Sequence, residues 1–490
     1  MKINPKLSTI AMFTLLTTST MCADEVLPKQ TLKANYQIKH NELPKLVNSL
    51  TDMFQEGVFY GRLRSNTFLY DWERETASQN SHIVSGIGGS LVYKSATFNN
   101  FDFSVGLYYS KAFFDNEDDP VDKLKPAKDL LSRYDYSSSG DKSMAVLGEA
   151  FISYKGLPKT EVHLGRQLVE TFYTKSNDTK MIPNTFDGAV VENKLLPKTS
   201  VKIAYLAEQK LRDHTSSHSV LAYDDSDTAN YSTWNGNDDS AMHKGLSYTN
   251  LSAAGVSTDA PLITGDIKNR GIKNLNLDTS FYWVPELLSE VMVEANYKTK
   301  IDDFTITPGI RYIKQFDNGG GKIGGANLDG SLAGVSGSSG GYKDASSLDS
   351  QMIAARLVGT YDIYKLNLAY SEIFDEADLV TPWRGFPTAG YTRSMARYNW
   401  KANTKSYRAE LQVNANNTGV YRDLLIQASV LHTDADENKG QYDENYYYIG
   451  FIQNIPSFVD LQWRLRLGYT DTKKADADSL DARLEFNYLF

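Results

Sequence analysis

The sequence predicts an all-β protein, a transmembrane antiparallel β-barrel of about 18 strands. Three observations lead to this prediction. Apolar and polar residues alternate with period two in many short stretches along the chain, as in strands with one face in each environment. The chain is rich in ring and small residues, with 31 Tyr, 21 Phe and 34 Gly. Beyond the N-terminus, no apolar run approaches the ~20 residues of a membrane helix.

The C-terminal residues give the clearest alternation. In 457–471, Leu461 and Trp463 alternate with Gln462 and Arg464, and in 479–490 the same pattern ends on Phe490. Aromatic residues on the apolar face lie near the strand ends, where membrane barrels carry their girdles. A final alternating strand that ends in Phe resembles the assembly signal of bacterial outer-membrane barrels.

Residues 1–23 are expected to be a secretory signal peptide. Lys2 and Lys6 precede the apolar run 7–16, and Ala23 offers a cleavage site. Lipidation of Cys22 is the alternative, but Met21 is larger than the residue that usually precedes a lipidated cysteine. Cleavage after Ala23 removes the only cysteine, and with it any disulfide or thiolate chemistry.

Residues 24–56 are expected to form a separate N-terminal periplasmic segment with a short amphipathic helix. Its apolar residues recur at helical spacing: Leu43, Leu46, Val47, Leu50, Met53 and Phe54. Asn41 is a candidate cap, and Gly57 follows the end. The helix is expected to pack against or under the barrel; a plug or docking element is the alternative.

The barrel is expected over residues 57–490. The predicted strands are 57–72, 82–96, 100–114, 144–156, 159–169, 184–195, 198–209, 258–269, 273–284, 288–300, 303–316, 349–361, 363–374, 403–415, 420–433, 443–454, 457–471 and 479–490. Long and short connectors alternate between them, as extracellular loops and periplasmic turns do. The short link 285–287 is an outside loop by this alternation.

The long connectors have the composition of loops. Residues 317–348 are mostly Gly, Ser, Asn and Asp, and 210–257 mix His, Asp, Ser and Tyr. The acidic run from Asp115 to Asp119 offers carboxylates to calcium, but it lacks the spacing of a calcium loop. It is therefore interpreted as a solvated acidic loop.

A closed barrel of this size has a water-filled interior, so its inward face decides its function. Placing the larger apolar residues outward puts eight arginines inward as a basic ladder: Arg62, Arg64, Arg311, Arg356, Arg408, Arg464, Arg466 and Arg483. Guanidiniums bind carboxylates in a bidentate manner, so such a ladder would guide anions. Alternatively, the arginines pair with inward acids: Asp460, Asp481, Glu485 and Glu410.

One connector is a candidate constriction. Residues 170–183 are compact and place Lys175, Asp178 and Lys180 close together. Folded into the barrel, this loop would narrow it; an ordinary outside loop is the alternative.

Several motifs resemble known porins. Glu149–Lys155, Val162–Gln167 and Asp178–Asn184 resemble the OprD-type outer-membrane porins, and Thr381–Trp400 and Leu461–Gly468 are similar to the major porins of epsilonproteobacteria. The resemblance implies an 18-stranded barrel with inward-folded constriction loops, passive uptake of small solutes, and often a preference for carboxylates. It assigns Asp178 and Lys180 to the constriction, and Asp375, Glu376 and Asp378 to its acidic side.

Other site chemistries find little support. The seven His form no triad or zinc motif, and His214 and His218 lie in a loop-like stretch. No catalytic residue, cofactor or metal is expected, and the formal charge of −9 argues against a nucleic-acid partner.

The sequence therefore favours a porin of the bacterial outer membrane that contacts lipid and passes small hydrophilic solutes and ions. Monomer and homotrimer both remain open. A barrel-platform enzyme and a structural or adhesive surface protein are the alternatives.

Overall fold

The computed structural model describes most of the chain. The described residues are 30–32, 36–41, 44–75, 81–115, 130–132, 135–136, 139–221, 245–246, 248–323, 342–395, 397–415 and 421–490. The expected signal peptide (1–23) lies outside them, as do Glu117, Asp118 and Asp119 of the acidic run and most of the Gly- and Ser-rich connector. Asp115, at the start of that run, pairs with Lys142 at 2.7 Å.

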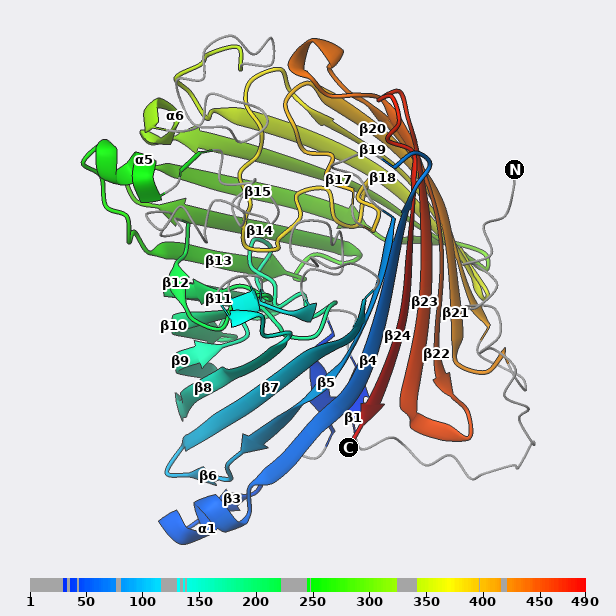
Figure 1. Cartoon of the computed structure of the whole chain (residues 1–490). Helices are drawn as coiled ribbons and strands as arrows, with labels where there is room; N and C mark the ends of the chain where they lie inside the picture. The colour runs from blue at the N-terminus through cyan, green and yellow to red at the C-terminus, as the bar shows by residue number, and fades with distance from the viewer. Residues whose placement is uncertain are drawn as a thin grey trace.

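Eighteen long strands close into one barrel in the described part of the chain (Figure 1). They are β4 (Val58–Trp72), β5 (His82–Lys94), β7 (Phe101–Asp115), β8 (Ser143–Leu157), β9 (Thr160–Gln167), β10 (Thr185–Asn193), β11 (Thr199–Lys210), β13 (Leu262–Asn269), β14 (Leu275–Val284), β15 (Leu288–Tyr297), β17 (Phe304–Asp317), β18 (Ser350–Tyr361), β19 (Tyr364–Ile373), β20 (Thr404–Ala415), β21 (Leu424–Asp434), β22 (Glu444–Ile455), β23 (Phe458–Thr472) and β24 (Ser479–Leu489). The predicted fold class is confirmed, and every predicted strand overlaps one of these.

Short elements accompany the barrel. β3 (Leu46–Val47), β6 (Thr97–Phe98), β12 (His218–Ser219) and β16 (Thr299–Ile301) extend its sheet, and β1 (Gln30–Leu32) pairs with β2 (Ile38–His40) in a separate two-stranded sheet. The helices are α1 (Leu50–Gln55), α5 (Tyr248–Ala253), α6 (Gly320–Ile323) and the 3-10 turn η6 (Glu437–Lys439). None of the described helices is long and apolar enough to cross a membrane.

The last strand closes the sheet on the first. β24 pairs antiparallel with β4, with Asn487 opposite Arg64. Phe490 continues this pairing, because its backbone exchanges hydrogen bonds with Gly61 at 3.0 and 3.2 Å. Closure pairs both edges of the sheet of long strands, which removes the usual site of edge-to-edge aggregation from the barrel.

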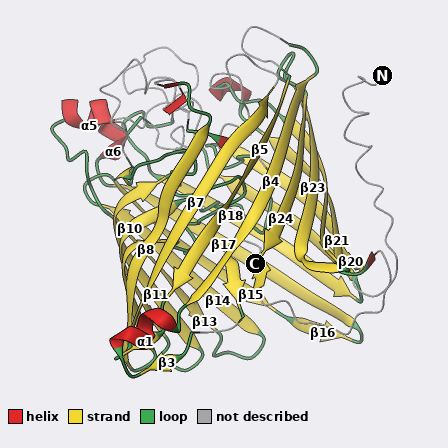
Figure 2. Ribbon diagram, turned by 60° about the horizontal axis from the view of Figure 1, so that its bottom comes forward, coloured by secondary structure: helices red, strands yellow, loops and turns green. Residues whose placement is uncertain are grey.

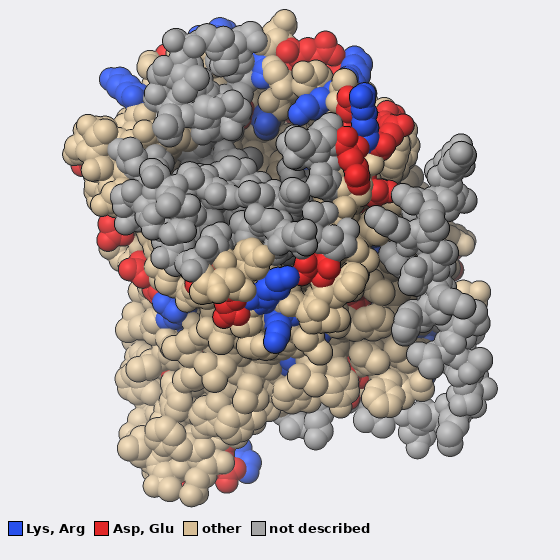
Figure 3. Space-filling view, in the orientation of Figure 1, with Lys and Arg blue, Asp and Glu red and all other residues tan. Residues whose placement is uncertain are grey.

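The outer surface is banded. The middle of the strands carries exposed aliphatic residues such as Leu63, Ile310 and Val430. Aromatic residues are exposed at both ends of the barrel: Phe59, Phe101, Tyr297, Phe304, Tyr361, Tyr364 and Phe458 at the end with short turns, and Phe113, Tyr205, Trp283, Phe316, Tyr407, Tyr447 and Tyr469 at the end with long loops. In Figure 3, charged residues gather near the upper rim and are sparse on the lower wall. This banding is that of a membrane-spanning barrel.

The N-terminal helix is shorter than its apolar pattern implied. α1 begins after Ser49, whose side chain accepts a hydrogen bond from the Asp52 amide, so Asn41 is not its cap. Leu46 and Val47 form β3 instead, which runs parallel to β6. Figure 2 shows α1 at the lower end of the barrel, outside its wall. The Phe54 carbonyl accepts a hydrogen bond from Tyr93 there.

Two neighbouring residues of β21 test which face of the strand points to lipid and which points to the interior of the barrel. Val430 is exposed on the outer face, and Ser429 is buried on the inner face next to Glu410. We expect Val430→Arg to lower the free energy of unfolding from lipid vesicles by about 2–4 kcal/mol, because it places a charge against lipid. Ser429→Arg should cost much less; equal losses in denaturant titrations would contradict the assignment of faces.

Candidate functional site

All eight arginines of the predicted ladder lie on the inner side of the barrel wall. On β4, Arg62 and Arg64 are buried whereas Leu63 between them is exposed, and on β17 Arg311 is buried between the exposed Ile310 and Tyr312. Because successive side chains on a strand point to opposite faces, every second residue faces the interior of the closed barrel. Arginines far apart in the sequence therefore lie in the same interior.

The arginines form two groups. Arg62 and Arg64 lie on β4, Arg483 lies on the neighbouring β24, and Arg464 and Arg466 follow on β23, where Arg466 is opposite Arg483, so these five share one wall. The second group comprises Arg311 on β17, Arg356 on β18 and Arg408 on β20. We call them the closure-wall group and the opposite group.

Seven of the eight contact a carboxylate. In the closure-wall group, Arg62 and Arg64 share Asp178, Arg466 pairs with Glu485, and Arg483 holds Asp481 with two bonds of 2.9 and 2.5 Å. In the opposite group, Arg311 and Arg356 share Glu294, and Arg408 pairs with Glu410. Asp481, Glu485 and Glu410 were among the acids expected to pair with the arginines.

The pairing leaves an excess of positive charge. Eight guanidiniums face five carboxylates, so the set retains three positive charges. The eighth arginine, Arg464, makes no hydrogen bond to a carboxylate of the described residues. Its guanidinium lies 4.1 Å from the centre of the Tyr36 ring. The two interpretations of the sequence, a basic ladder and paired arginines, therefore both describe part of the set.

The opposite group also holds a long loop inside the barrel. The loop between β19 and β20 (residues 374–403, the β19–β20 loop) runs through the interior in yellow in Figure 1. Arg311 donates to the carbonyls of Pro387 and Ala389 at 2.6 and 2.9 Å, and Arg356 donates to Gly390 at 2.8 Å. These bonds pin the tip of the loop to the wall.

The ring of Tyr391 completes this anchor. It lies between two guanidiniums, 4.5 Å from Arg311 and 4.6 Å from Arg356, and its carbonyl accepts a hydrogen bond from Arg408 at 3.3 Å. Stacking of this kind suits the planar guanidinium better than an ammonium group.

The closure-wall group anchors the second inward loop. The loop between β9 and β10 (residues 168–184, the β9–β10 loop) reaches β4 through Asp178, whose Oδ1 lies 2.7 Å from Nη1 of Arg64. The Lys180 carbonyl accepts from Asn66, and the Met181 carbonyl accepts from Arg64 at 3.4 Å. The structure thus confirms the prediction that this loop folds into the barrel.

The β9–β10 loop also reaches the far wall. The Phe172 amide donates to Asp266 of β13 at 2.9 Å. Within the loop, Glu170 accepts from the amide and hydroxyl of Ser176 at 2.8 and 2.5 Å. The loop therefore crosses the interior from β13 to β4 as a self-bonded unit.

The two loops are joined to each other. The Lys175 amide donates to the Trp383 carbonyl at 3.0 Å, and the Gly385 amide donates to the Tyr173 carbonyl at 2.9 Å. At Gly385 a Cβ atom would lie 2.3 Å from the Tyr173 carbonyl oxygen, so only glycine permits this approach.

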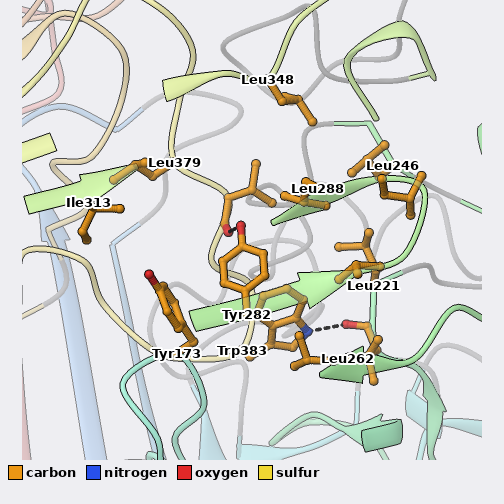
Figure 4. Packing of buried hydrophobic residues seen from close by; sticks show 14 of the residues in the cluster. Tyr173, Leu221, Leu246, Leu262, Tyr282, Leu288, Ile313, Leu348, Leu379 and Trp383 are labelled. Carbon is orange, nitrogen blue, oxygen red and sulfur yellow. Dashed lines mark hydrogen bonds between the residues drawn. The ribbon is translucent and has the colours of Figure 1, made fainter. Parts of the chain in front are cut away.

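An apolar cluster fixes the β19–β20 loop against the wall (Figure 4). Tyr282 donates to the Val380 carbonyl at 2.7 Å, and Trp383 donates to the Val220 carbonyl at 2.6 Å. Ile313 and Leu288 belong to the same buried cluster. Ile313 lies on the same face of β17 as Arg311, as alternation predicts, and the loop covers this apolar stretch of the inner wall.

The other predicted constriction residues have different surroundings. Lys175 lies 3.7 Å from Glu170, and burial lowers its pKa from the usual value while Glu170 opposes that shift. Lys180 lies 4.2 Å from the Phe68 ring. The three acids of the later loop lie at its start, just after β19: Asp375 pairs with Lys439 at 2.9 Å, Glu376 accepts from Gln351 at 2.9 Å, and Asp378 accepts from the Ala402 amide at 2.7 Å.

Three important residues were absent from the sequence prediction. Glu294 had a usable signal, because it faces Arg311 in the register that the short turn between β15 and β17 sets. Tyr391 and Tyr36 lie outside any strand pattern, so alternation could not identify them.

The described residues contain no group of three or more His, Cys, Asp and Glu arranged for a metal ion. The rings of His214 and His218 lie 4.9 Å apart, and both residues fall outside a helix. His163 bonds to Ser153 at 2.9 Å.

Solved structures share this architecture. OccK8 (OprE) of Pseudomonas aeruginosa is 15% identical, with a TM-score of 0.68, over 89% of this chain and 99% of that one. OccAB3 of Acinetobacter baumannii is 14% identical, with a TM-score of 0.68, over 89% and 100%. OpdK of P. aeruginosa, solved with vanillate, is 11% identical, with a TM-score of 0.64, over 89% and 99%. At these identities the likeness establishes the barrel fold. No protein-family model and no curated protein matches the chain.

Asp178→Asn tests the anchor of the β9–β10 loop. The change keeps the side-chain shape but leaves Arg62 and Arg64 without their shared charge, and removing one partner of a buried pair costs about 3–5 kcal/mol. We expect the loop to detach more often, so trypsin should cut folded protein faster after Lys175 or Lys180.

Asp375→Asn is the matched control, since Asp375 is half-exposed and pairs with Lys439 away from the β9–β10 loop. Mass spectrometry measures the cleavage rates. Equal rates in the two variants and the wild type would show that Asp178 does not hold the loop.

Proposed function

We propose that this protein is a porin of the bacterial outer membrane through which small hydrophilic solutes and ions diffuse passively. One observation carries the proposal: a closed, lipid-compatible barrel encloses an interior lined by eight arginines and narrowed by two anchored loops. A structural barrel would not need inward guanidiniums on six strands, whereas a channel uses charged groups to select solutes.

The fold neighbours support this proposal. OpdK is described as an outer-membrane protein of P. aeruginosa, and the Occ structures share the same barrel. The motifs that resemble the major porins of epsilonproteobacteria, such as Thr381–Trp400, make up most of the β19–β20 loop, and Arg384 and Gly385 in that stretch meet the β9–β10 loop.

We further propose a preference for carboxylate-bearing solutes. The five arginines of the closure-wall group face three carboxylates, Asp178, Glu485 and Asp481, so the group offers positive charge to a passing anion. Partial neutralisation by wall acids suits passage, because a bound solute must also leave. Vanillate, the molecule solved with OpdK, is itself a carboxylate.

Reversing two charges of the closure-wall group tests this selectivity. We expect Arg464→Glu combined with Arg466→Glu to move the reversal potential in a salt gradient toward cation selectivity. The reason is that Glu485, which pairs with Arg466, would then add to two new negative charges on the same wall. Planar-bilayer recordings of refolded protein measure the shift.

Arg74→Glu serves as the control, because Arg74 is exposed and pairs with Asp476 in the outer loops. Salt screens such a charge within about 8–10 Å. A double variant with the reversal potential of the wild type would remove Arg464 and Arg466 from the solute path.

A further inference from the structure

The N-terminal segment reaches into the barrel from the end with short turns. Here the segment means the described residues 30–32 and 36–41. β1 and β2 pair antiparallel, with Gln30 opposite His40. The Gln30 side chain donates to the Phe490 carbonyl, and Figure 1 shows β1 near the C-terminus. The segment is therefore attached at the point where the barrel closes.

From this attachment the segment contacts the arginine wall. The Tyr36 carbonyl accepts a hydrogen bond from Nη1 of Arg62 at 3.1 Å. The Tyr36 ring covers the guanidinium of Arg464 at 4.1 Å, and Tyr36 is only 5% exposed. His40 adds a ring contact with Tyr60 of β4 at 5.4 Å between centroids.

The segment also touches the β9–β10 loop. Nε2 of Gln37 lies 3.5 Å from Oε1 of Glu170, the residue that organises that loop. Tyr36, Gln37, Asp178 and Arg62 line one cavity of about 370 Å³, together with wall residues such as Lys94 and Lys202. The segment and the loop thus bound the same space from opposite sides.

The backbone indicates that contacts hold Tyr36 in place. Its φ is 67°, a left-handed conformation that bulky residues rarely adopt. Such conformations cost about 1–3 kcal/mol and persist where the surroundings determine them. The hydrogen bond from Arg62 and the cation–π contact with Arg464 supply these surroundings.

We propose that Tyr36 and Gln37 are selectivity-determining residues inside the pore. This inference rests on the proposed porin function. Tyr36 shields Arg464, which has no carboxylate hydrogen bond among the described residues, and it occupies one donor of Arg62. The segment therefore limits both the width of the pore and the positive charge that a carboxylate solute meets at the periplasmic exit.

Tyr36→Ala tests the shielding. Removing the ring uncovers the Arg464 guanidinium without changing any formal charge, so the expected change is modest. We expect the anion-to-cation permeability ratio to rise about twofold and the single-channel conductance to increase. Tyr421→Ala is the matched control, because Tyr421 is a tyrosine at the same end of the barrel with 60% of its surface exposed.

A second variant reads out the position directly. Gln37→Cys is made in a chain in which Cys22, where the mature protein retains it, is replaced by Ser. The new cysteine should react with a negatively charged methanethiosulfonate reagent, and this reaction should reduce the current. Both variants are first checked for folding by β-sheet circular dichroism and heat-modifiable migration.

The outcomes separate the two proposals. A wild-type channel with an unchanged Tyr36→Ala variant and no effect of labelling Gln37→Cys would overturn this inference and leave the porin standing. A wild-type protein that inserts but carries no current would overturn both. Changes in Tyr36→Ala and labelling block in Gln37→Cys, with Tyr421→Ala unaffected, support the inference.

Discussion

The closure of the sheet between β24 and β4 is the constraint on which the rest of the structure depends. In lipid every backbone polar group needs a partner within the protein, so a spanning sheet must return to its own first strand. Here Phe490 and Gly61 complete that seam. The same seam puts Arg62 and Arg64 on one wall with Arg464, Arg466 and Arg483, although the sequence separates them by about 400 residues. The most basic wall of the interior is thus a consequence of where the chain ends meet.

The wall arginines have two roles at once. A guanidinium has five N–H donors in a fixed plane, so one group can bind a carboxylate and still donate to a loop carbonyl. Arg311 does so with Glu294 and Pro387, and Arg64 does so with Asp178 and Met181. Lysine could not reproduce this geometry. The same arginines thus anchor the two loops that narrow the interior and exceed in number the carboxylates that pair with them. In the proposed porin, width and selectivity depend on the same residues.

The sequence predicted the regular part of the structure well and the irregular part less well. Strands such as Phe304–Asp317 followed from alternation, and alternation alone turned all eight arginines inward. Alternation also places Ile313 on the inner face with Arg311, but it could not show that Ile313 and Leu288 pack under the β19–β20 loop, because that contact joins segments far apart in the sequence. The contacts of Asp178 with β4, and those of Tyr36 with Arg62 and Arg464, join residues far apart in the sequence and could not be read from spacing. Glu294 was within reach, because a short turn sets its register against Arg311.

Single-channel recording of the refolded wild-type protein in a planar bilayer, with a salt gradient across it, tests the central claim most directly. A barrel narrowed by two arginine-anchored loops should give discrete conductance steps and a reversal potential on the anion side. Insertion without conductance would contradict the pore, and a reversal potential on the cation side would contradict the role assigned to the arginines.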